Sequence, residues 1–161
     1  MHARYVDGVT IRPLRNGDVG TVLAVLGRLG PRSRAQRFGG PKPRVSEGEL
    51  EQLARVDRRR HALVAWVDGD PEPAGLAQLV RDGASAELAF AVVDVHQGRG
   101  IGSVLARELA GDALAAGITE LRATVTGDNP RVVSLLRRVT GSVRETWLGG
   151  GQRELVLRLE R

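Results

Sequence analysis

The sequence predicts an α/β (α+β) fold with a mixed, mostly antiparallel central sheet of about seven strands and about four helices on its faces. Two observations predict it. Apolar and alternating strand patterns are interspersed with helical patterns, in the order β-α-α-β-β-β-α-β-α-β-β. Three of the strand segments also follow one another across short turns between residues 61 and 93, which indicates an antiparallel meander. We expect residues 1–161 to form a single domain.

The N-terminal part is predicted to hold one strand and two helices. Asp18 is a suitable N-cap for the first helix. Ser46 starts the second helix with a capping box, because Glu49 lies three residues further on. The expected elements are a strand at 9–14, a helix at about 19–29, a loop rich in Arg, Gly and Pro at 31–45, and a helix from Ser46.

The rest of the chain alternates between strands and two further helices. The expected elements are strands at 62–67, 74–80 and 85–93, a helix at 100–116, a strand at 119–126, a helix from about 129 to 138, and a final hairpin of strands at 142–147 and 154–159. The strands before and after the helix at 100–116 should be parallel, because a strand-helix-strand crossover connects them.

A glycine-rich turn joins the strand at 85–93 to the following helix. Gly98, Gly100 and Gly102 occupy alternate positions there. The first N–H groups of a helix have no partner within the helix and lie at the positive end of its dipole. Because glycines let a phosphate approach the backbone closely, this turn is predicted to bind a phosphate group.

Two common phosphate-binding motifs do not fit this turn. A P-loop needs Lys followed by Ser or Thr after its last glycine, whereas Ile101, Gly102 and Ser103 stand here. A dinucleotide site needs Gly-x-Gly-x-x-Gly after the first strand of its unit, whereas the spacing here is Gly-x-Gly-x-Gly and three strands precede the strand that leads into the turn. The acid near the expected offset, Glu120, starts the next strand and lies at the wrong end to reach a ribose.

The remaining pattern is Gln/Arg-x-x-Gly-x-Gly/Ala, which Gln97, Gly100 and Gly102 match. With the mixed topology, the chain resembles the GNAT superfamily of N-acetyltransferases over nearly its whole length. The resemblance implies a GNAT fold splayed between its fourth and fifth strands, with acetyl-CoA as co-substrate and its pantetheine arm in the gap.

The resemblance also implies the residues that bind the cofactor. The backbone of Phe90, Ala91 and Val92 would pair with pantetheine, and the backbone of Gln97, Gly98, Arg99, Gly100, Ile101, Gly102 and Ser103 would hold the diphosphate. Asn129 matches a family asparagine that helps to fix the cofactor, and it is equally suited to cap the helix that begins at Pro130. Arg137 or Arg138 could contact a CoA phosphate or belong to a solvated helix face.

Glu87 is the candidate general base for an acceptor amine, which is protonated at neutral pH. It lies in an apolar strand, where partial desolvation would raise its pKa. The alternative is a structural ion pair with an arginine of a neighbouring strand. Ala-Glu-Leu-Ala-Phe at 86–90, followed by the glycine turn, is similar to the catalytic domain of actinobacterial Pat-type protein lysine acetyltransferases, whose glutamate at this place is the proposed base. The segment from Ser33 to Phe38 resembles them too.

One position departs from the common GNAT pattern. Many members carry a tyrosine seven residues after the asparagine as general acid for the CoA thiolate, and Leu136 stands here. The single tyrosine, Tyr5, lies outside the motif. We therefore expect water, a backbone N–H or unaided departure to serve the leaving thiolate.

Composition limits the other functions. There is no cysteine, and the three histidines are far apart in the sequence, so we expect no metal site. No apolar run has the length of a membrane span, so we expect a cytoplasmic protein with no membrane contact. The formal net charge is +5, with arginines concentrated between residues 28 and 60. Because no aromatic residues interleave with them, a solvated face is favoured over nucleic-acid binding.

Three functions follow from these patterns. The leading one is direct acetyl transfer from acetyl-CoA to a primary amine, with a protein lysine as the favoured acceptor and Glu87 as general base. The alternatives are a small-molecule amine N-acetyltransferase and a catalytically silent acyl-CoA-binding regulatory module, which Leu136 keeps open. The sequence also leaves a homodimer open.

Overall fold

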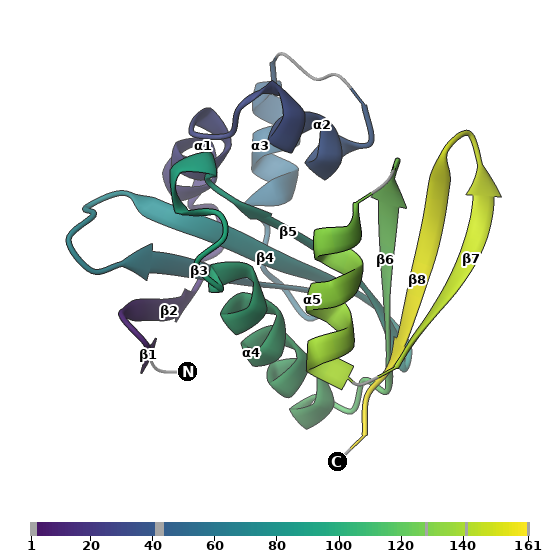
Figure 1. Cartoon of the computed structure of the whole chain (residues 1–161). Coiled ribbons are helices and arrows are strands. Elements are labelled where there is room, and N and C mark those ends of the chain that lie inside the picture. The colour runs from purple at the N-terminus through teal and green to yellow at the C-terminus, as the bar shows by residue number, and fades with distance from the viewer. Residues whose placement is uncertain (1–2, 41–43, 128, 141, 161) are drawn as a thin grey trace.

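The computed structural model describes residues 3–40, 44–127, 129–140 and 142–160 (Figure 1). These residues form a mixed eight-stranded sheet with the strand order β1-β2-β3-β4-β5-β6-β8-β7. The strands are β1 (Arg4–Val6), β2 (Val9–Pro13), β3 (Arg60–Val67), β4 (Pro73–Asp82), β5 (Ser85–Val92), β6 (Glu120–Thr126), β7 (Val143–Gly149) and β8 (Gln152–Arg158). The helices are α1 (Val19–Gly27), α2 (Pro31–Phe38), α3 (Glu47–Leu53), α4 (Ile101–Ala115) and α5 (Pro130–Thr140), with a 3-10 turn at Asp94–His96.

The predicted α/β class and mixed sheet are confirmed, with one more strand than expected. The additional strand is β1, a three-residue segment that pairs with β2. Every other predicted strand is present, with ends that differ by at most two residues. β5 and β6 run parallel, as the crossover through α4 requires.

The prediction of a loop at 31–45 is wrong for its first half, which forms α2. The helix begins with Pro31 at its first turn and ends at Gly39, which takes the left-handed conformation. None of its residues is fully buried, so it lacks the apolar periodicity by which helices are recognised. Its two ends were nevertheless visible in the sequence as helix-capping residues.

Both predicted N-caps are confirmed. The Asp18 carboxylate accepts a hydrogen bond from the Thr21 N–H at 3.1 Å at the start of α1. At α3, the Ser46 hydroxyl accepts from the Glu49 N–H at 3.1 Å, and the Glu49 carboxylate accepts from the Ser46 N–H at 3.3 Å. Local capping chemistry therefore fixes where these helices begin.

The sheet carries helices on both faces (Figure 1). Helix α4 packs against β3, β4 and β5 on one face and against α5 beside it. Its Leu105 and Leu109 are fully buried, and each such side chain contributes about 1.5–3 kcal/mol of burial free energy. On the other face α1 contacts β4 through a stripe that includes the fully buried Val22 and Val25.

Strands β5 and β6 part soon after they meet, which confirms the predicted splay. They pair only between Ser85–Glu87 and Glu120–Arg122, although both continue for four or more residues beyond. Beyond Glu87 the strand edges face a gap instead of each other. No helix in the described residues is long and apolar enough to cross a membrane.

Candidate active site

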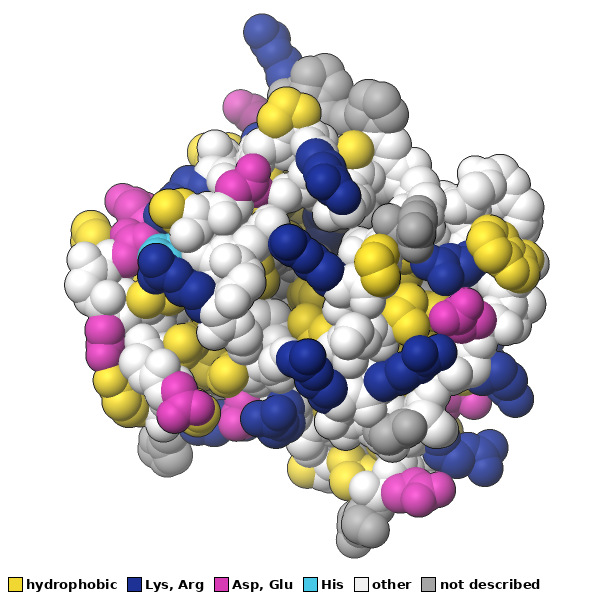
Figure 2. Space-filling model, viewed as in Figure 1, with side chains coloured by type: hydrophobic (Ala, Val, Ile, Leu, Met, Phe, Trp, Pro, Cys, Tyr) yellow, Lys and Arg dark blue, Asp and Glu magenta, His cyan; other side chains and the backbone are white. Residues whose placement is uncertain are grey.

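A groove of about 1020 Å³ runs through the gap between β5 and β6. Figure 2 shows its opening on the α4–α5 face, where arginine side chains surround a hollow floored by apolar side chains. All but one of the predicted site residues line it: Glu87, Phe90, Ala91, Val92, Gln97, Gly98, Gly100, Ile101, Gly102, Ser103 and Asn129. The exception is Arg99, whose exposed side chain turns toward His96.

The turn before α4 has the geometry of an anion site. Gly98 and Gly100 both take left-handed conformations, with φ of 78° and 82°. Gly100 is the N-cap of α4, and no side chain caps the helix there. The N–H of Val104 is the first to bond back along the helix, to the Gly100 carbonyl at 3.1 Å. The preceding N–H groups are therefore available to an anion in the groove.

Glycine at position 102 permits close packing between helices. A Cβ atom there would lie 2.9 Å from Cδ1 of Leu135 and 3.7 Å from Cγ2 of Val92. The absence of a side chain lets the first turn of α4 approach α5 beneath the groove. This position therefore shapes the site without contacting an anion through a side chain.

The turn is anchored to the β3–β4 connection by a buried histidine. His96 is only 7% exposed, and its Nε2 lies 2.7 Å from Oδ2 of Asp70. The same carboxylate pairs with Arg28 at 2.8 Å, and Arg99 lies 3.3 Å from Nδ1 of His96. Hydrogen bonds from His96, from the Glu72 N–H and from Arg28 hold the pKa of Asp70 well below its ordinary value.

Sequence reasoning missed this anchor. His96 is one of the three histidines without metal-ligand spacing, and no sequence pattern links it to Asp70. Their separation in sequence hides the contact, and the position of His96 directly before the glycine turn was the one available signal. In the parts of the chain that the structure describes, no group of three or more His, Asp or Glu residues is placed to hold a metal ion.

Gln97 contributes to the site mainly through its side chain. Its Nε2 donates to the Val92 carbonyl and to the Ser33 hydroxyl, both at 2.9 Å, and thereby joins β5, the glycine turn and α2. Its own N–H donates to the Asp94 carbonyl at 3.2 Å. A diphosphate would therefore be bound by the N–H groups that follow Gln97 rather than by Gln97 itself.

The edge of β5 that faces the gap presents alternate backbone groups. Val93 donates its N–H to the Ala74 carbonyl of β4 at 2.9 Å, and Val92 is the residue opposite Gly75. Because hydrogen bonds alternate along an antiparallel pair, Phe90 and Val92 point their amide groups away from β4 and Ala91 points toward it. Of the three predicted residues, Phe90 has its backbone groups available to pantetheine and Val92 has its N–H, because the Val92 carbonyl accepts from Gln97.

Asn129 combines the two roles considered for it. Its Oδ1 accepts a long hydrogen bond of 3.4 Å from the Val132 N–H at the start of α5, which is a capping contact. It also lines the groove. The geometry is therefore compatible with a cap whose amide also reaches a ligand.

Glu87 lies on the opposite face of the sheet from α4. It stands opposite Val80 on β4 and Arg122 on β6. Arg122 pairs with Glu120 at 2.6 Å and Glu154 at 3.3 Å, and no ion pair within 4 Å joins Glu87 to any arginine of the described residues. The alternative of a structural ion pair between Glu87 and an arginine of β6 is therefore not observed.

The predicted desolvation of Glu87 is wrong for the free protein, because its side chain is exposed on the wall of the groove. The gap between the strands leaves the carboxylate open to solvent. A second charged group, Arg37 of α2, lines the same groove. Burial lowers the pKa of Arg37, and the negative charge of Glu87 offsets part of that effect.

Neither position considered for a general acid supplies one. Leu136 is fully buried in the core between α5 and the sheet, so a side chain at this position does not face the groove. Tyr5 is 63% exposed on β1 and donates to Asp68, which raises its pKa. The leaving thiolate therefore has no tyrosine beside it.

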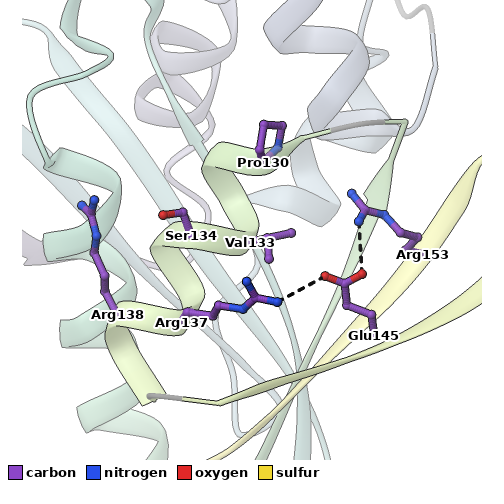
Figure 3. A pocket seen from close by; sticks show the side chains of 7 residues that line it. All are labelled: Pro130, Val133, Ser134, Arg137, Arg138, Glu145 and Arg153. Carbon is purple, nitrogen blue, oxygen red and sulfur yellow. Dashed lines mark hydrogen bonds and ion pairs between the residues drawn. The ribbon is translucent and has the colours of Figure 1, made fainter.

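A smaller cavity of about 440 Å³ lies beside α5 and distinguishes the two arginines of that helix (Figure 3). Arg137 points to Glu145, with a separation of 3.9 Å, and Arg153 binds the same carboxylate at 3.2 Å. Arg138 points away from this pair and lines both cavities. Arg138 is therefore the one placed to meet a ligand of the large groove.

A splayed sheet with a helix N-terminal anion site beside the gap defines an acyl-CoA-dependent transferase, and comparison with known proteins agrees. The family model described as "Acetyltransferase (GNAT) family" matches residues 32–141. The match covers more than half of the chain, so the chain belongs to this family.

Two curated relatives are similar in sequence. Acetyltransferase Pat from Mycolicibacterium smegmatis is 32% identical over 133 residues, which cover 80% of this chain and 40% of that protein. Mycothiol acetyltransferase from Nocardia farcinica is 34% identical over 142 residues, which cover 86% of this chain and 43% of that protein. The chain thus spans less than half the length of these two relatives.

Solved structures share the fold. The GNAT domain of S. lividans PAT superposes with a TM-score of 0.83 at 26% identity, over 94% of this chain and 90% of that one. Spermidine N-acetyltransferase from Vibrio cholerae, in complex with CoA and spermine, superposes with a TM-score of 0.72 at 19% identity, over 96% and 97% of the two chains. At that identity the second likeness concerns the fold alone.

Proposed function

We propose that this protein transfers the acetyl group of acetyl-CoA directly to the side-chain amine of a protein lysine, with Glu87 as general base. One observation carries the proposal. The glycine turn and Glu87 lie on opposite faces of the sheet, at either side of the gap where β5 and β6 part. A donor and an acceptor can therefore approach the same point from opposite faces.

The donor side would be held by backbone groups. The N–H groups from Gly98 to Ser103 would bind the diphosphate, and the free edge of β5 at Phe90 and Val92 would pair with the pantetheine amides. Arg138 would meet a phosphate at the rim. The proposal also carries a cytoplasmic location with it, because acetyl-CoA is abundant there.

The chemistry needs one base. Glu87 takes a proton from the acceptor ammonium, directly or through a water molecule. The neutral amine nitrogen then attacks the thioester carbonyl carbon, so that a C–N bond forms and the C–S bond breaks. One of the two protons left on the nitrogen passes to solvent, and the other remains as the amide N–H. CoA leaves as a thiolate and takes a proton from solvent, which is feasible without Tyr because a thiol has a pKa of about 8.5.

The charge of the groove favours a lysine over a polyamine. Among its described lining residues Glu87 is the only acid, against four arginines at 32, 37, 131 and 138. A polyamine carries several positive charges and would need several carboxylates, whereas a lysine brings one. The 32% identity to Pat and the TM-score of 0.83 with the GNAT domain of a PAT protein support the same acceptor class.

A comparison of acceptors tests the proposal. Labelled acetyl-CoA is supplied with lysine-bearing proteins or with a panel of amino acids, polyamines and aminoglycosides. We expect the label on protein lysines. If transfer to small amines dominates, the protein acceptor is wrong and the small-molecule N-acetyltransferase is right. If CoA binds but no amine is acetylated, the catalytically silent regulatory module is favoured.

The role of Glu87 is tested by Glu87→Gln. We expect kcat to fall by about 10²- to 10⁴-fold, as for loss of a general base, with little change in the Kd for CoA. Glu51→Gln removes an exposed acid of α3 outside the groove and serves as the matched control. Turnover that survives in Glu87→Gln would remove Glu87 from the chemistry.

A further inference from the structure

Helix α2 contacts β5 and lines the groove with several of its residues, and it is fixed at several points. The Ser33 hydroxyl accepts a hydrogen bond from Gln97 of the glycine turn. At the other end, a Cβ atom on Gly39 would lie 3.3 Å from Nε2 of Gln152 and 3.5 Å from Oγ1 of Thr126. The helix therefore extends from the glycine turn to the ends of β6 and β8, across the mouth of the gap.

Arg37, near the end of α2, is held rigidly in this position. Its NH2 donates to Oε1 of Gln78 at 2.7 Å, and Nε2 of Gln78 donates to the Leu53 carbonyl at 2.7 Å. Its guanidinium also lies 5.1 Å from the ring centroid of Phe38. Gln78 and the aromatic ring are uncharged, so they fix the guanidinium without neutralising it.

The remaining donors of Arg37 are open to the groove. Within the described residues, NH1 and Nε make no hydrogen bond, and no carboxylate lies within 4 Å of the guanidinium. Arg153 Nε is the only described side-chain nitrogen or oxygen that is sealed from solvent without a partner, so the free donors of Arg37 are accessible. A guanidinium offers two parallel N–H groups that match a carboxylate.

Arg37 and Glu87 face the same side of the sheet. On β4, Gln78 stands opposite Ala89 and Val80 stands opposite Glu87, so Gln78 and Glu87 point to the same face. The arginine held by Gln78 is therefore beside the candidate base. Burial lowers the pKa of Arg37, and Glu87 is the carboxylate whose negative charge offsets part of that effect.

We propose that Arg37 is a specificity-determining residue, which pairs with a carboxylate of the acceptor while Glu87 receives the proton of the acceptor amine. The preferred acceptor is then a lysine with an aspartate or glutamate beside it. This inference rests on the proposed function, because it concerns the acceptor of the same reaction. It adds a chemical requirement that acetyl transfer itself does not impose.

Two capped pentapeptides with a central lysine test this inference. The lysine is flanked on both sides by glutamate in one peptide and by glutamine in the other. We expect kcat/KM to be about tenfold higher for the glutamate peptide, mostly through KM, as for one charge-assisted contact made before the chemical step. Arg37→Gln should bring the ratio of the two kcat/KM values to about one.

Three further variants make the result specific. Arg58→Gln, an exposed arginine outside the groove, should keep the full preference. Arg37→Lys should keep part of it, because an ammonium retains the charge without the two parallel donors. Gln78→Glu should abolish it with Arg37 still present, because the new carboxylate would occupy the guanidinium.

Two results would overturn the inference. The wild-type protein could use both peptides equally, or Arg37→Gln could slow both by the same factor, which would indicate an action on Glu87 or on the fold. A failure of the proposed function looks different: CoA binds in a calorimeter, but neither peptide is acetylated, and both proposals then fall.

Discussion

The two sides of the gap between β5 and β6 are built from different parts of the chain. On the α4 side the site consists of backbone: left-handed Gly98 and Gly100, uncapped N–H groups and a free strand edge. On the α2 side it consists of side chains, with Glu87 on β5 and Arg37 held by Gln78. A backbone site suits a constant donor such as acetyl-CoA, whereas a side-chain site can change with the acceptor.

The parting of the strands is tolerated because each half of the sheet has another partner. β6 pairs with β8 along all seven of its residues, and β5 pairs with β4 along all eight, whereas β5 and β6 share three pairs. Each half therefore keeps its hydrogen bonds without the other. The gap can stay open for a ligand at the cost of a few backbone groups that the ligand itself can satisfy.

The largest expected effect on CoA binding comes from a change to the backbone side, Gly100→Val. Gly100 has a φ of 82°, which a β-branched residue adopts only with strain. Strain of about 1–3 kcal/mol would deform the turn and raise the Kd for CoA by roughly 5- to 150-fold. Isothermal titration calorimetry with CoA measures the Kd of the variant and of the wild type.

Gly111→Ala is the matched control on the same helix. Gly111 lies within α4, and a Cβ atom there would meet nothing within 4 Å. Alanine should stabilise the helix by about 0.5–1 kcal/mol and leave CoA binding unchanged. An unaltered Kd in Gly100→Val would show that the donor side does not depend on this backbone conformation.

A smaller effect is expected from Asp70→Asn, which loosens the anchor of the turn. His96, the Glu72 N–H and Arg28 hold the pKa of Asp70 below its ordinary value, so ionised Asp70 stabilises the fold. This stabilisation is complete at pH values above the ordinary pKa of an aspartate, near 3.9, and it is lost as the pH falls below that value. We expect the variant to melt at a lower temperature and to bind CoA a few-fold more weakly.

Thermal unfolding between about pH 3 and 7 measures this contribution. The difference in melting temperature between wild type and Asp70→Asn should be full above about pH 5 and should narrow below about pH 4. Glu72→Gln removes an exposed carboxylate from the same turn and should show no such pH dependence. A difference that persists unchanged at low pH would assign the effect to packing rather than to charge.

The contrast between the α4 side and the α2 side of the gap also explains which parts of the site could be predicted from the sequence. The glycine turn, the strand before it and the capped starts of α1 and α3 depend on neighbouring residues, and a local pattern reveals them. Helix α2 buries no residue completely and was predicted as a loop. Without α2 in place, neither Arg37 nor the cover of the acceptor side could be foreseen.

Residues joined only in three dimensions were likewise out of reach. The contact between His96 and Asp70 spans 26 residues, and that between Arg37 and Gln78 spans 41. The expected burial of Glu87 failed for a related reason. Alternation along a strand gives the face of a residue but not how far a neighbouring strand has moved away from it.

The smallest expected effect separates the two arginines of α5 and asks whether the donor side uses any side chain at all. Arg138 lines the large groove, whereas Arg137 points to Glu145 at 3.9 Å with its side chain 59% exposed. Arg138→Gln should raise the Kd for CoA about threefold, as expected for one solvent-screened charge contact, and added salt should reduce that difference. Arg137→Gln, the matched control, should leave the Kd unchanged. If both variants bind CoA like the wild type, neither arginine of α5 contributes to CoA binding, and the donor side depends more fully on backbone groups than the acceptor side does.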